Sequence, residues 1–291
     1  MRRIAFLTLS DPQNFVIDDD LAIKPLAQRG WQVETVPWNR PGVDWRRYQL
    51  VVIRSTWDYH HHADRFLRVL EQIEHSGVRL ENGSEIARWN MQKTYLRDLA
   101  LRGIDIVPTF WRDRLAPGEL VPLFEELRSE EAVIKPVLSA TAQGAWRLDA
   151  ASVQRQAAEI EAYYADRPLM LQPFERGIVE EGEFSMIYFN GVHSHSILKV
   201  PQRGDFRVQE EHGSTVVPIA PEPTLLAAGN AAVVAVGSKL LYARVDLVRS
   251  GDSFRVMELE LVEPGFYLRT SPGAPERFAE AVTALVRASG N

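Results

Sequence analysis

The sequence predicts a mixed fold, with a parallel α/β unit at the N-terminus and a longer α+β region behind it. Apolar, β-rich segments alternate with helical segments over residues 1–82, which is typical of βαβ units that form a mostly parallel sheet. Two later stretches each contain a pair of β-rich runs joined by turn residues, which indicates antiparallel hairpins. A length of 291 residues, 45% of them hydrophobic, leaves room for two or three domains.

The N-terminal unit is expected to place a ligand site at the end of one strand. Functional residues of open α/β sheets lie beyond the carboxyl ends of the strands, and the stretch "RSTWD" occupies such a position. Two roles are open for Arg54: a clamp on a substrate carboxylate, or an ion pair between domains. The predicted strands are residues 3–9, 31–38, 48–57 and 78–82, the predicted helices are 18–30 and 63–77, and the predicted substrate-side residues are Arg54, Ser55, Trp57 and Asp58.

The rest of the chain begins with a helix expected over residues 84–103, with Ser84 as its N-cap and Gly103 after its end. Asn190-Gly191, between two β-rich runs, is a strong hairpin signal. We expect strands at 132–137 and 168–174, hairpins at 183–200 and 242–262, and helices at 151–166, 224–240 and 275–289. These elements divide the chain into regions 1–83, 84–170 and 171–291, with residues 108–170 forming the middle region proper.

Composition and missing motifs exclude several classes of protein. A net charge of −6 gives no basic excess for nucleic acid or an anionic membrane. No apolar run approaches the ~18 residues of a membrane span, and the N-terminus is typical of a first strand rather than a signal peptide, so we expect a cytoplasmic protein. The chain has no cysteine, P-loop, G-x-G-x-x-G or G-x-S-x-G motif.

A pair of carboxylates in "VMELELVEPG" points to a possible metal site. Glu258 and Glu260 lie two residues apart in an apolar strand and therefore share one face. If the loop of the second hairpin is centred on Asp252, Asp246 lies opposite Glu258 on that face. Three hard oxygen donors suit Mg²⁺. The alternative is a solvated sheet face whose carboxylates pair with lysine or arginine.

Two lysines and a histidine run are further candidates. Lys135 lies in the apolar strand "AVIKP", directly before the small-residue loop "LSATAQG", and either reaches phosphates there or extends along an edge into water. Lys93 lies in a predicted helix, where most lysines are solvated. The run His60–His62 is expected to form a polar loop, since adjacent histidines point apart.

Taken in order, the motifs of residues 84–270 resemble those of the ATP-grasp ligases. The motifs are "MQKTYLRDLALRGIDIVPTF", "AVIKPVLSATAQG", "LMLQPFERGIVEEGEFS", "HSILKVPQRGDFRVQEEHG", "ARVDLV" and "VMELELVEPG". The chain is similar to glutathione synthetase-like and ribosomal-protein glutamate ligases. It resembles most the cyclo-ligases that form cycloserine from an O-ureido amino acid, through "VVIRSTWDY", "QPF", "EGEFS", "GDFRVQ" and "ELVEPGFYL". The resemblance implies an ATP-grasp fold behind the N-terminal α/β unit, with residues 84–170 as the small subdomain and 171–291 as the metal- and substrate-binding subdomain.

The resemblance also implies where the nucleotide binds. Lys93 and Lys135 match the lysines that contact phosphates and adenine, and the loop that contains Ser139 matches the one that covers the phosphates. Gln172 and Phe174 match the hinge that binds adenine. Glu183 matches the carboxylate that binds ribose, with Glu180 and Glu181 left open as alternatives.

The resemblance assigns the metal and substrate roles to the second half of the chain. Asp246, Glu258 and Glu260 match the trio that holds two Mg²⁺ ions, although Glu260 replaces the usual asparagine. The added charge is expected to bind metal more tightly or to pair with Lys199 or Arg207. Those two cations match residues near the transferred phosphate, and Glu263 is expected to face the substrate amine.

The implied activity is ATP-dependent carboxylate–amine ligation through an acyl phosphate, on a small amino-acid-derived substrate. An intramolecular reaction, an intermolecular ligation of amino acids or peptides, and a non-catalytic ATP-binding regulatory protein stay open as alternatives. A homodimer is common in the family that the chain resembles.

Overall fold

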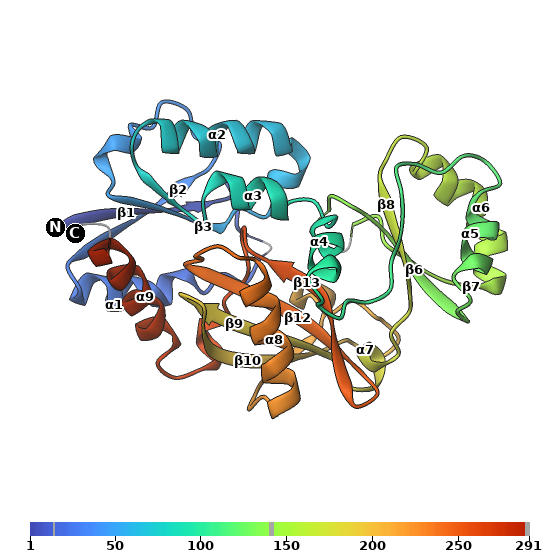
Figure 1. The fold of residues 1–291 in the computed structure, drawn as a ribbon. Helices are drawn as coiled ribbons and strands as arrows, with labels where there is room; N and C mark the ends of the chain where they lie inside the picture. Colours follow the sequence, from blue (N-terminus) through green and yellow to red (C-terminus); the bar gives the residue numbers. More distant parts are fainter. Residues whose placement is uncertain (14, 140–142, 289–291) are drawn as a thin grey trace.

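The computed structural model describes residues 1–13, 15–139 and 143–288, and within them the strands form three sheets with helices around them (Figure 1). The N-terminal sheet has the strand order β2-β1-β3-β4, and all its pairings are parallel, as predicted. Its helices cover two faces, with α2 and α3 on one side and α1 and α9 on the other (Figure 1). Its strands are β1 (Arg2–Thr8), β2 (Trp31–Pro37), β3 (Leu50–Ser55) and β4 (Arg79–Glu81), and the helices and 3₁₀ turns along it are η1 (Asp19–Ala22), α1 (Ile23–Gln28), η2 (Trp45–Arg47), η3 (Tyr59–His62) and α2 (Ala63–His75).

The single helix expected over residues 84–103 is two helices, α3 (Ser84–Asn90) and α4 (Tyr95–Leu101). The break has a physical reason, because the backbone N–H of Lys93 donates to the carbonyl of Val137 at 2.9 Å instead of continuing the helix. Ser84 is not the N-cap, which is Gly83. The carboxylate of Glu74 takes the capping role and accepts from the backbone N–H of Ser84 at 3.0 Å.

A small antiparallel sheet forms a separate lobe, seen edge-on at the right of Figure 1. Its strand order is β5-β8-β6-β7, and its core packs against α5 and α6. The boundary expected after residue 170 falls inside β8, and since β8 pairs with β5 and β6 we place the boundary after that strand. The elements of this lobe are β5 (Phe110–Arg112), α5 (Leu120–Glu126), β6 (Glu131–Pro136), β7 (Trp146–Asp149), α6 (Ala150–Tyr163) and β8 (Leu169–Pro173).

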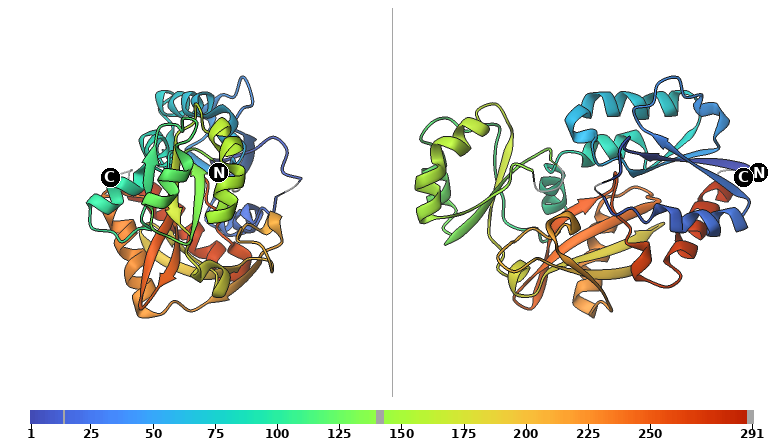
Figure 2. Two further views of the ribbon diagram at one scale, coloured as in Figure 1. Left: turned by 90° about the vertical axis from the view of Figure 1, so that its right-hand side faces the viewer. Right: turned by 180° about the vertical axis from the view of Figure 1, so that it is seen from behind.

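The third sheet is antiparallel, with five strands in the order β11-β10-β9-β12-β13. Asn190 and Gly191 form the predicted β9–β10 turn, with positive φ angles of 50° and 76°. Helix α8 packs on one face over β12 and β13, which leaves the other face to the lobes above it (Figure 2). The elements are α7 (Gly177–Glu180), β9 (Glu183–Phe189), β10 (Val192–Val200), η4 (Glu210–His212), β11 (Thr215–Ile219), α8 (Pro223–Ala235), β12 (Tyr242–Ser250), β13 (Ser253–Glu260) and η5 (Leu268–Thr270).

A β-bulge sets the register of β12 and β13. The hairpin loop is centred between Gly251 and Asp252, because Ser250 pairs with Ser253, so a loop centred on Asp252 is wrong. The predicted pairing of Asp246 with Glu258 is nevertheless correct, since a bulge beside Asp246 shifts the register by one residue. Without that shift, Glu258 would turn to the opposite face of the sheet.

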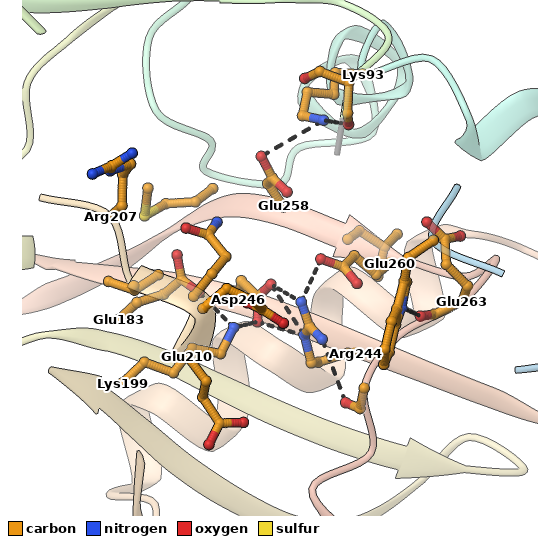
Figure 3. A pocket seen from close by; sticks show the side chains of 18 of the residues that line it. Lys93, Glu183, Lys199, Arg207, Glu210, Arg244, Asp246, Glu258, Glu260 and Glu263 are labelled. Atoms are coloured by element: carbon orange, nitrogen blue, oxygen red, sulfur yellow. Dashed lines mark hydrogen bonds and ion pairs between the residues drawn. The ribbon is translucent and has the colours of Figure 1, made fainter. Parts of the chain in front are cut away.

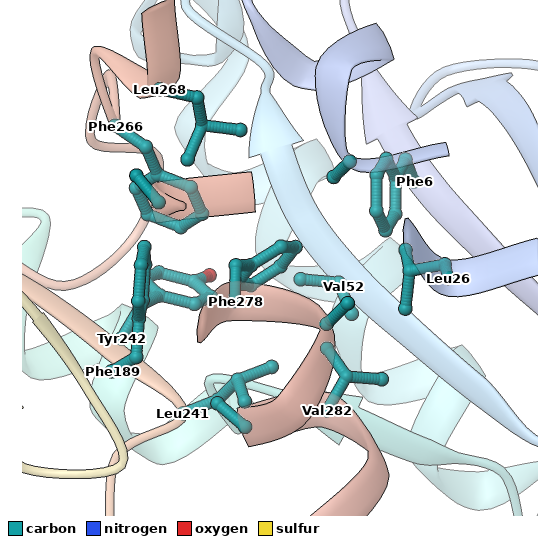
Figure 4. Packing of buried hydrophobic residues seen from close by; sticks show 14 of the residues in the cluster. Phe6, Leu26, Val52, Phe189, Leu241, Tyr242, Phe266, Leu268, Phe278 and Val282 are labelled. Carbon is teal, nitrogen blue, oxygen red and sulfur yellow. The ribbon is translucent and has the colours of Figure 1, made fainter. Parts of the chain in front are cut away.

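The C-terminal helix ties the third sheet to the N-terminal sheet. Phe278 and Val282 of α9 (Ala274–Ala288) share one apolar core with Phe6 and Val52 of the N-terminal sheet and with Tyr242 of β12 (Figure 4). This shared core holds the N-terminal sheet against β12 and the segment that follows β13. In the described ranges, no helix is long and apolar enough to cross a membrane.

Candidate active site

One pocket collects residues from all three sheets. The N-terminal unit contributes Arg54, Trp57 and Tyr59 together with the stretch 15–19 that leads into η1. The small sheet contributes Lys135 and residues 172–175, and the third sheet contributes its polar face (Figure 3). The pocket lies at the carboxyl end of β3, where the sequence places a ligand site.

The floor of the pocket is the polar face of the third sheet, where basic and acidic side chains lie next to one another. Directly opposed pairs share a face of a sheet, and here Lys199 opposes Glu183, and Arg244 opposes Glu260. The third such pair, Asp246 and Glu258, consists of two carboxylates. Because the strand pairing aligns these residues, the neighbouring charges compensate one another.

Lys199 forms ion pairs with two carboxylates. Its Nζ lies 2.8 Å from Oε1 of Glu183 and 3.5 Å from Oδ1 of Asp246, and the side chain is almost fully buried. Burial would lower the pKa of Lys199, but Asp246 and Glu183 together raise it. Glu183, matched above to a ribose-binding carboxylate, therefore has a structural partner. Glu181 is bound to Arg249 at 2.8 Å, and of the three candidate glutamates only Glu183 lines the pocket.

Arg244 is a site residue that the sequence reasoning missed. Its Nε and Nη2 lie 3.0 and 2.9 Å from the two oxygens of Asp246, and its Nη2 also donates to Glu260. The expected pairing of Glu260 with Lys199 or Arg207 is therefore wrong, because strand pairing places Arg244 directly opposite it. The available signal was the spacing in "ARVDLV", where Arg244 precedes Asp246 by two residues.

Glu258 bridges the two lysines of the site. Its Oε1 lies 3.1 Å from Nζ of Lys135 and 3.9 Å from Nζ of Lys93 (Figure 3). Burial would raise the pKa of Glu258, but the two lysines outweigh it and lower the pKa to about 2. Lys93 lies in the turn between α3 and α4 and also donates to the carbonyl of Ser139 at 3.0 Å. The residues that the sequence matched to phosphate contacts are thus brought together around one carboxylate.

The carboxylates of Asp246, Glu258 and Glu260 supply hard oxygen donors on one sheet face, which suits Mg²⁺. Arg244, Lys93 and Lys135 are bound to these carboxylates. In the part of the chain that the structure describes, no three His, Asp or Glu side chains gather closely enough to hold a metal ion. The donor set fits the metal, and binding would require these three cations to change partners.

The hinge between the small and third sheets lies at residues 172–174. Gln172 is buried and donates its amide to the hydroxyl of Thr109 at 2.9 Å, and Phe174 lines the pocket. The backbone N–H of Phe174, matched to an adenine contact, donates to the carbonyl of Glu131 at 2.9 Å. The phosphate-covering loop expected over residues 138–144 falls partly on positions 140–142, which lie outside the described residues.

The ion pair of Arg54 lies within the N-terminal unit, not between domains, and one of its donors stays free. Its Nε and Nη2 contact Oδ1 of Asp19 at 3.0 and 2.9 Å, and Nη2 also donates to the carbonyl of Pro264. The guanidinium stacks on the ring of Phe266, and its buried Nη1 has no partner among the described residues. Arg54 lines the pocket, so this nitrogen is a candidate contact for a substrate oxygen.

The other residues of "RSTWD" divide between the pocket and the scaffold. Trp57 lines the pocket and donates to the carbonyl of Glu263 at 2.8 Å. Ser55 shares a 2.9 Å hydrogen bond with Thr8, and Asp58 accepts from the indole of Trp38 at 2.7 Å. Ser55 and Asp58 do not line the pocket, which leaves Arg54 and Trp57 as the candidate substrate residues of this stretch.

The segment after β13 is irregular, and side chains from other elements hold its carbonyls. Donors reach the carbonyls of residues 261–266 in turn, mostly at 2.7–3.0 Å, and satisfy backbone groups that no strand partner serves. These donors are Asn82, Tyr242, Trp57, Arg54, Arg244 and His195. The result is a rigid wall that presents Glu263 and Tyr267 to the pocket.

Glu263 and Arg207 occupy different environments. Burial, together with the nearby carboxylate of Glu260, raises the pKa of Glu263 to about 8. Arg207 lies in the loop before η4 and pairs with Asp205 at 2.7 Å, with its side chain 41% exposed. Both residues line the pocket, and the half-exposed side chain of Arg207 lies nearer to solvent.

Comparisons with known proteins assign the class. The family described as the N-terminal domain of D-cycloserine synthetase DcsG matches residues 4–82. The cycloserine biosynthesis protein DcsG of Streptomyces lavendulae is 32% identical over 94% of this chain and 96% of its own. A crystal structure of D-cycloserine synthetase DcsG superposes with a TM-score of 0.83 at 29% identity, covering 98% of this chain and 99% of the other.

More distant ATP-grasp structures share the fold alone. The D-alanine–D-alanine ligase from Bacillus anthracis complexed with ATP gives a TM-score of 0.69 at 14% identity, with both chains fully covered. The ATP-grasp ligase PsnB complexed with its minimal precursor, Mg and ADP gives 0.65 at 16% identity over 98% of each chain. The fold and the comparisons define an ATP-grasp C–N ligase. Within that class, the chain belongs to the DcsG family.

Proposed function

We propose that this enzyme activates the carboxylate of one small amino-acid-derived substrate with ATP and closes a ring by attack of an amine in the same molecule. The observation that carries the proposal is a single pocket with two chemically distinct ends. One end holds Lys93 and Lys135, and the other holds the free Nη1 of Arg54 and the carboxyl of Glu263. Such a pocket offers a place for phosphates and a place for a zwitterion, and the 32% identity to DcsG supports the choice of a cyclo-ligase.

The nucleotide is proposed to bind between the small and third sheets. Its phosphates would take the place of Glu258 as partners of the two lysines. The proposed nucleotide residues are Lys93, Lys135, Ser139, Gln172, Phe174 and Glu183, and the proposed metal ligands are Asp246, Glu258 and Glu260, for two Mg²⁺ ions. When bound, the metal would offset the negative charge that develops on the transferred phosphoryl group.

The chemistry needs no protein nucleophile. A carboxylate oxygen of the substrate attacks the γ-phosphorus, the bond to ADP breaks, and an acyl phosphate forms. A nitrogen elsewhere in the same molecule, which in O-ureido-serine is the ureido nitrogen bonded to oxygen, attacks the acyl carbon, phosphate leaves, and the attacking nitrogen gives up a proton. Because the amine belongs to the same molecule, it acts at a high effective concentration and needs no second binding site.

The protein side chains have separate parts in these steps. Lys135 and Arg207 offset charge on the phosphoryl group, and Lys199 holds Asp246 in place from below. Arg54 and Trp57 bind the substrate. Glu263 takes the proton of the amine, and its raised pKa of about 8 suits a base that works near neutral pH.

The test supplies the wild-type enzyme with ATP, Mg²⁺ and O-ureido-serine as the single organic substrate. We expect ADP, phosphate and a cyclised product one water lighter than the substrate, because one carboxylate oxygen leaves with the phosphate; hydrolysis of the carbamoyl group to CO₂ and ammonia would lighten the product further. Lys135→Met should abolish turnover, whereas Lys239→Met, the same change at an exposed site outside the pocket, should not. A strict requirement for a second amine would point to an intermolecular ligase, and AMP formation would contradict phosphoryl transfer to the carboxylate. No turnover with any amino acid would favour a regulatory ATP-binding protein.

A further inference from the structure

Resting on the proposed function, we propose that Tyr267 is a specificity-determining residue whose ring closes the substrate end of the pocket and restricts it to compact substrates. Tyr267 follows "ELVEPGF" and lines the pocket. Three observations carry the proposal: its backbone conformation, the contacts that enforce that conformation, and the position of its ring.

The backbone of Tyr267 is in the left-handed region, with φ 49° and ψ 41°. A bulky residue adopts this region only when its surroundings impose it, and such residues cluster at functional sites. In the described ranges, two other non-glycine residues have positive φ. Asn190 lies in the Asn-Gly turn, where asparagine is well suited, and Arg128 lies in an exposed turn of the small lobe. Of the three, only Tyr267 lines the pocket.

The neighbours of Tyr267 enforce this conformation. Phe266 and Leu268, on either side, are each 2% exposed and belong to the apolar core of the N-terminal sheet and α9 (Figure 4). The carbonyl of Tyr267 accepts from the backbone N–H and the hydroxyl of Thr270 at 2.9 and 2.8 Å. Two buried flanking side chains and a closed turn hold Tyr267 in place, and its partly buried ring packs against the edge of that core while lining the pocket.

The ring lies among three cations that line the pocket. Its centroid is 5.6 Å from Nζ of Lys199 and 5.8 Å from Cζ of Arg244, the two cations that hold Asp246. It is 5.5 Å from Cζ of Arg269, which binds Asp18 at 2.7 Å and so ties in the N-terminal wall. Cations near an aromatic face are attracted to it and fix the ring.

A fixed ring in this position is proposed to limit substrate size. Tyr267 and Arg54 line the same pocket, so in the proposed pose the substrate shares that space with the ring while its carboxylate reaches the phosphate end. An aromatic side chain has only two rotatable bonds, and three cations surround this one, so it cannot easily swing aside. We therefore expect substrates with bulky side-chain substituents to be excluded by Tyr267.

The experiment compares substrate profiles. ADP release is measured with Mg²⁺, ATP, hydroxylamine as the nucleophile that traps the acyl phosphate, and a panel of both enantiomers of serine, O-ureido-serine and O-benzylserine. Tyr267→Asn removes the ring and keeps a residue that tolerates the left-handed region, and Tyr267→Gly is a second ring-free variant. Tyr267→Phe retains the ring. Arg128→Asn is the matched control, since it makes the same change at a positive-φ site outside the pocket.

We expect both ring-free variants to use O-benzylserine at least tenfold better than the wild type, while Tyr267→Phe and Arg128→Asn keep the wild-type profile. Calorimetry with Mg²⁺ and AMP-PNP should give affinities within threefold of the wild type, which shows that the nucleotide end is intact. The proposal would be overturned if Tyr267→Asn and Tyr267→Gly had the same substrate profile as the wild type, including the case in which none of them uses any substrate. It would also be overturned if Arg128→Asn or Tyr267→Phe accepted O-benzylserine as well as the ring-free variants do. If the wild type uses serine but not O-ureido-serine, the proposed substrate is wrong, and a profile that broadens in Tyr267→Asn still supports the role of Tyr267.

Discussion

Replacing Glu258 with glutamine should destabilise the empty enzyme but strengthen its binding of nucleotide in the absence of metal. Glutamine keeps the size of the side chain and removes the charge that pairs with Lys93 and Lys135. Burial raises the pKa of Glu258, the two lysines outweigh it, and the net lowering from 4.5 to about 2 corresponds to about 3 kcal/mol. Since the side chain is 26% exposed, solvent screening reduces the expected loss of stability to about 1–3 kcal/mol.

The pH dependence follows from the sign of that shift. A carboxyl whose folded pKa is lowered stabilises the protein above its unfolded pKa of 4.5, and this stability is lost as the pH falls through about 2. At pH 7, Glu258→Gln should therefore lower the Tm of the empty enzyme by roughly 2–10 °C. The two melting curves should converge as the pH falls from 4.5 toward 2.

The same change should strengthen nucleotide binding when metal is absent. In the wild type, incoming phosphates must displace Glu258 from the lysines and also meet its negative charge. Glu258→Gln removes both obstacles, so calorimetry without Mg²⁺ should show AMP-PNP bound about tenfold more tightly, equivalent to ~1.4 kcal/mol. Addition of Mg²⁺ should tighten binding strongly in the wild type and little in the variant, because one proposed ligand is gone.

Glu34→Gln is the matched control, since Glu34 pairs with Arg47 at 2.6 Å on the surface and both side chains are at least 35% exposed. Exposed ion pairs contribute little, so its Tm should change by less than the equivalent of ~1 kcal/mol, with nucleotide binding unchanged. The reasoning would be refuted if Glu258→Gln melted like the wild type and kept the full Mg²⁺ enhancement.

Three further changes test other parts of the site. Lys135→Met should keep the fold and weaken binding of Mg²⁺-AMP-PNP by roughly 2–3 kcal/mol, the range for a charge-assisted hydrogen bond, and an unchanged calorimetric affinity would remove Lys135 from the nucleotide site. Arg54→Ala leaves Asp19 without its buried partner and should destabilise the protein by about 3–5 kcal/mol in chemical denaturation, whereas Arg54→Lys should lose less stability but still show a raised substrate KM. A KM equal to that of the wild type in Arg54→Lys would leave Arg54 only its structural contacts with Asp19 and Pro264. The pKa of Glu263 is raised from 4.5 to about 8 in the folded state, so between these pH values the folded protein holds a proton that the unfolded chain has lost. The free energy of unfolding should therefore fall as the pH rises from 4.5 to about 8, with a slope approaching ~1.4 kcal/mol per pH unit. Glu263→Gln should flatten that slope in denaturation series, and a slope equal to that of the wild type would contradict the raised pKa.

The sequence alone determined the features that depend on local pattern. Alternation of apolar segments predicted the parallel sheet, and Asn190-Gly191 predicted a hairpin that the structure confirms, because short turns impose their own backbone geometry. The spacing of Glu258 and Glu260 placed both on one face, since side chains of a strand alternate with a period of two. Family motifs added the fold behind these elements, and the comparisons confirm it.

The tertiary structure decided which charges meet. Register across β12 and β13 gave Glu260 its partner Arg244, and the bulge that aligns Asp246 with Glu258 has no local signal in the sequence. Docking of the small lobe brought Lys135 onto Glu258, across 123 positions of the chain. Such pairings depend on how separate elements pack, and no window of the sequence contains both partners.

The same reason explains why the sequence did not single out Tyr267, and why it placed Arg54 at the end of a strand without giving its partners. The sequence shows a tyrosine after "EPGF", but its left-handed backbone follows from the burial of Phe266 and Leu268 in a core shared with α9. Arg54 was assigned to the end of a strand, and only packing showed that Asp19 and Pro264 take most of its donors. Local periodicity fixes the direction in which a side chain leaves its strand or helix, whereas its partners depend on segments far away in the chain.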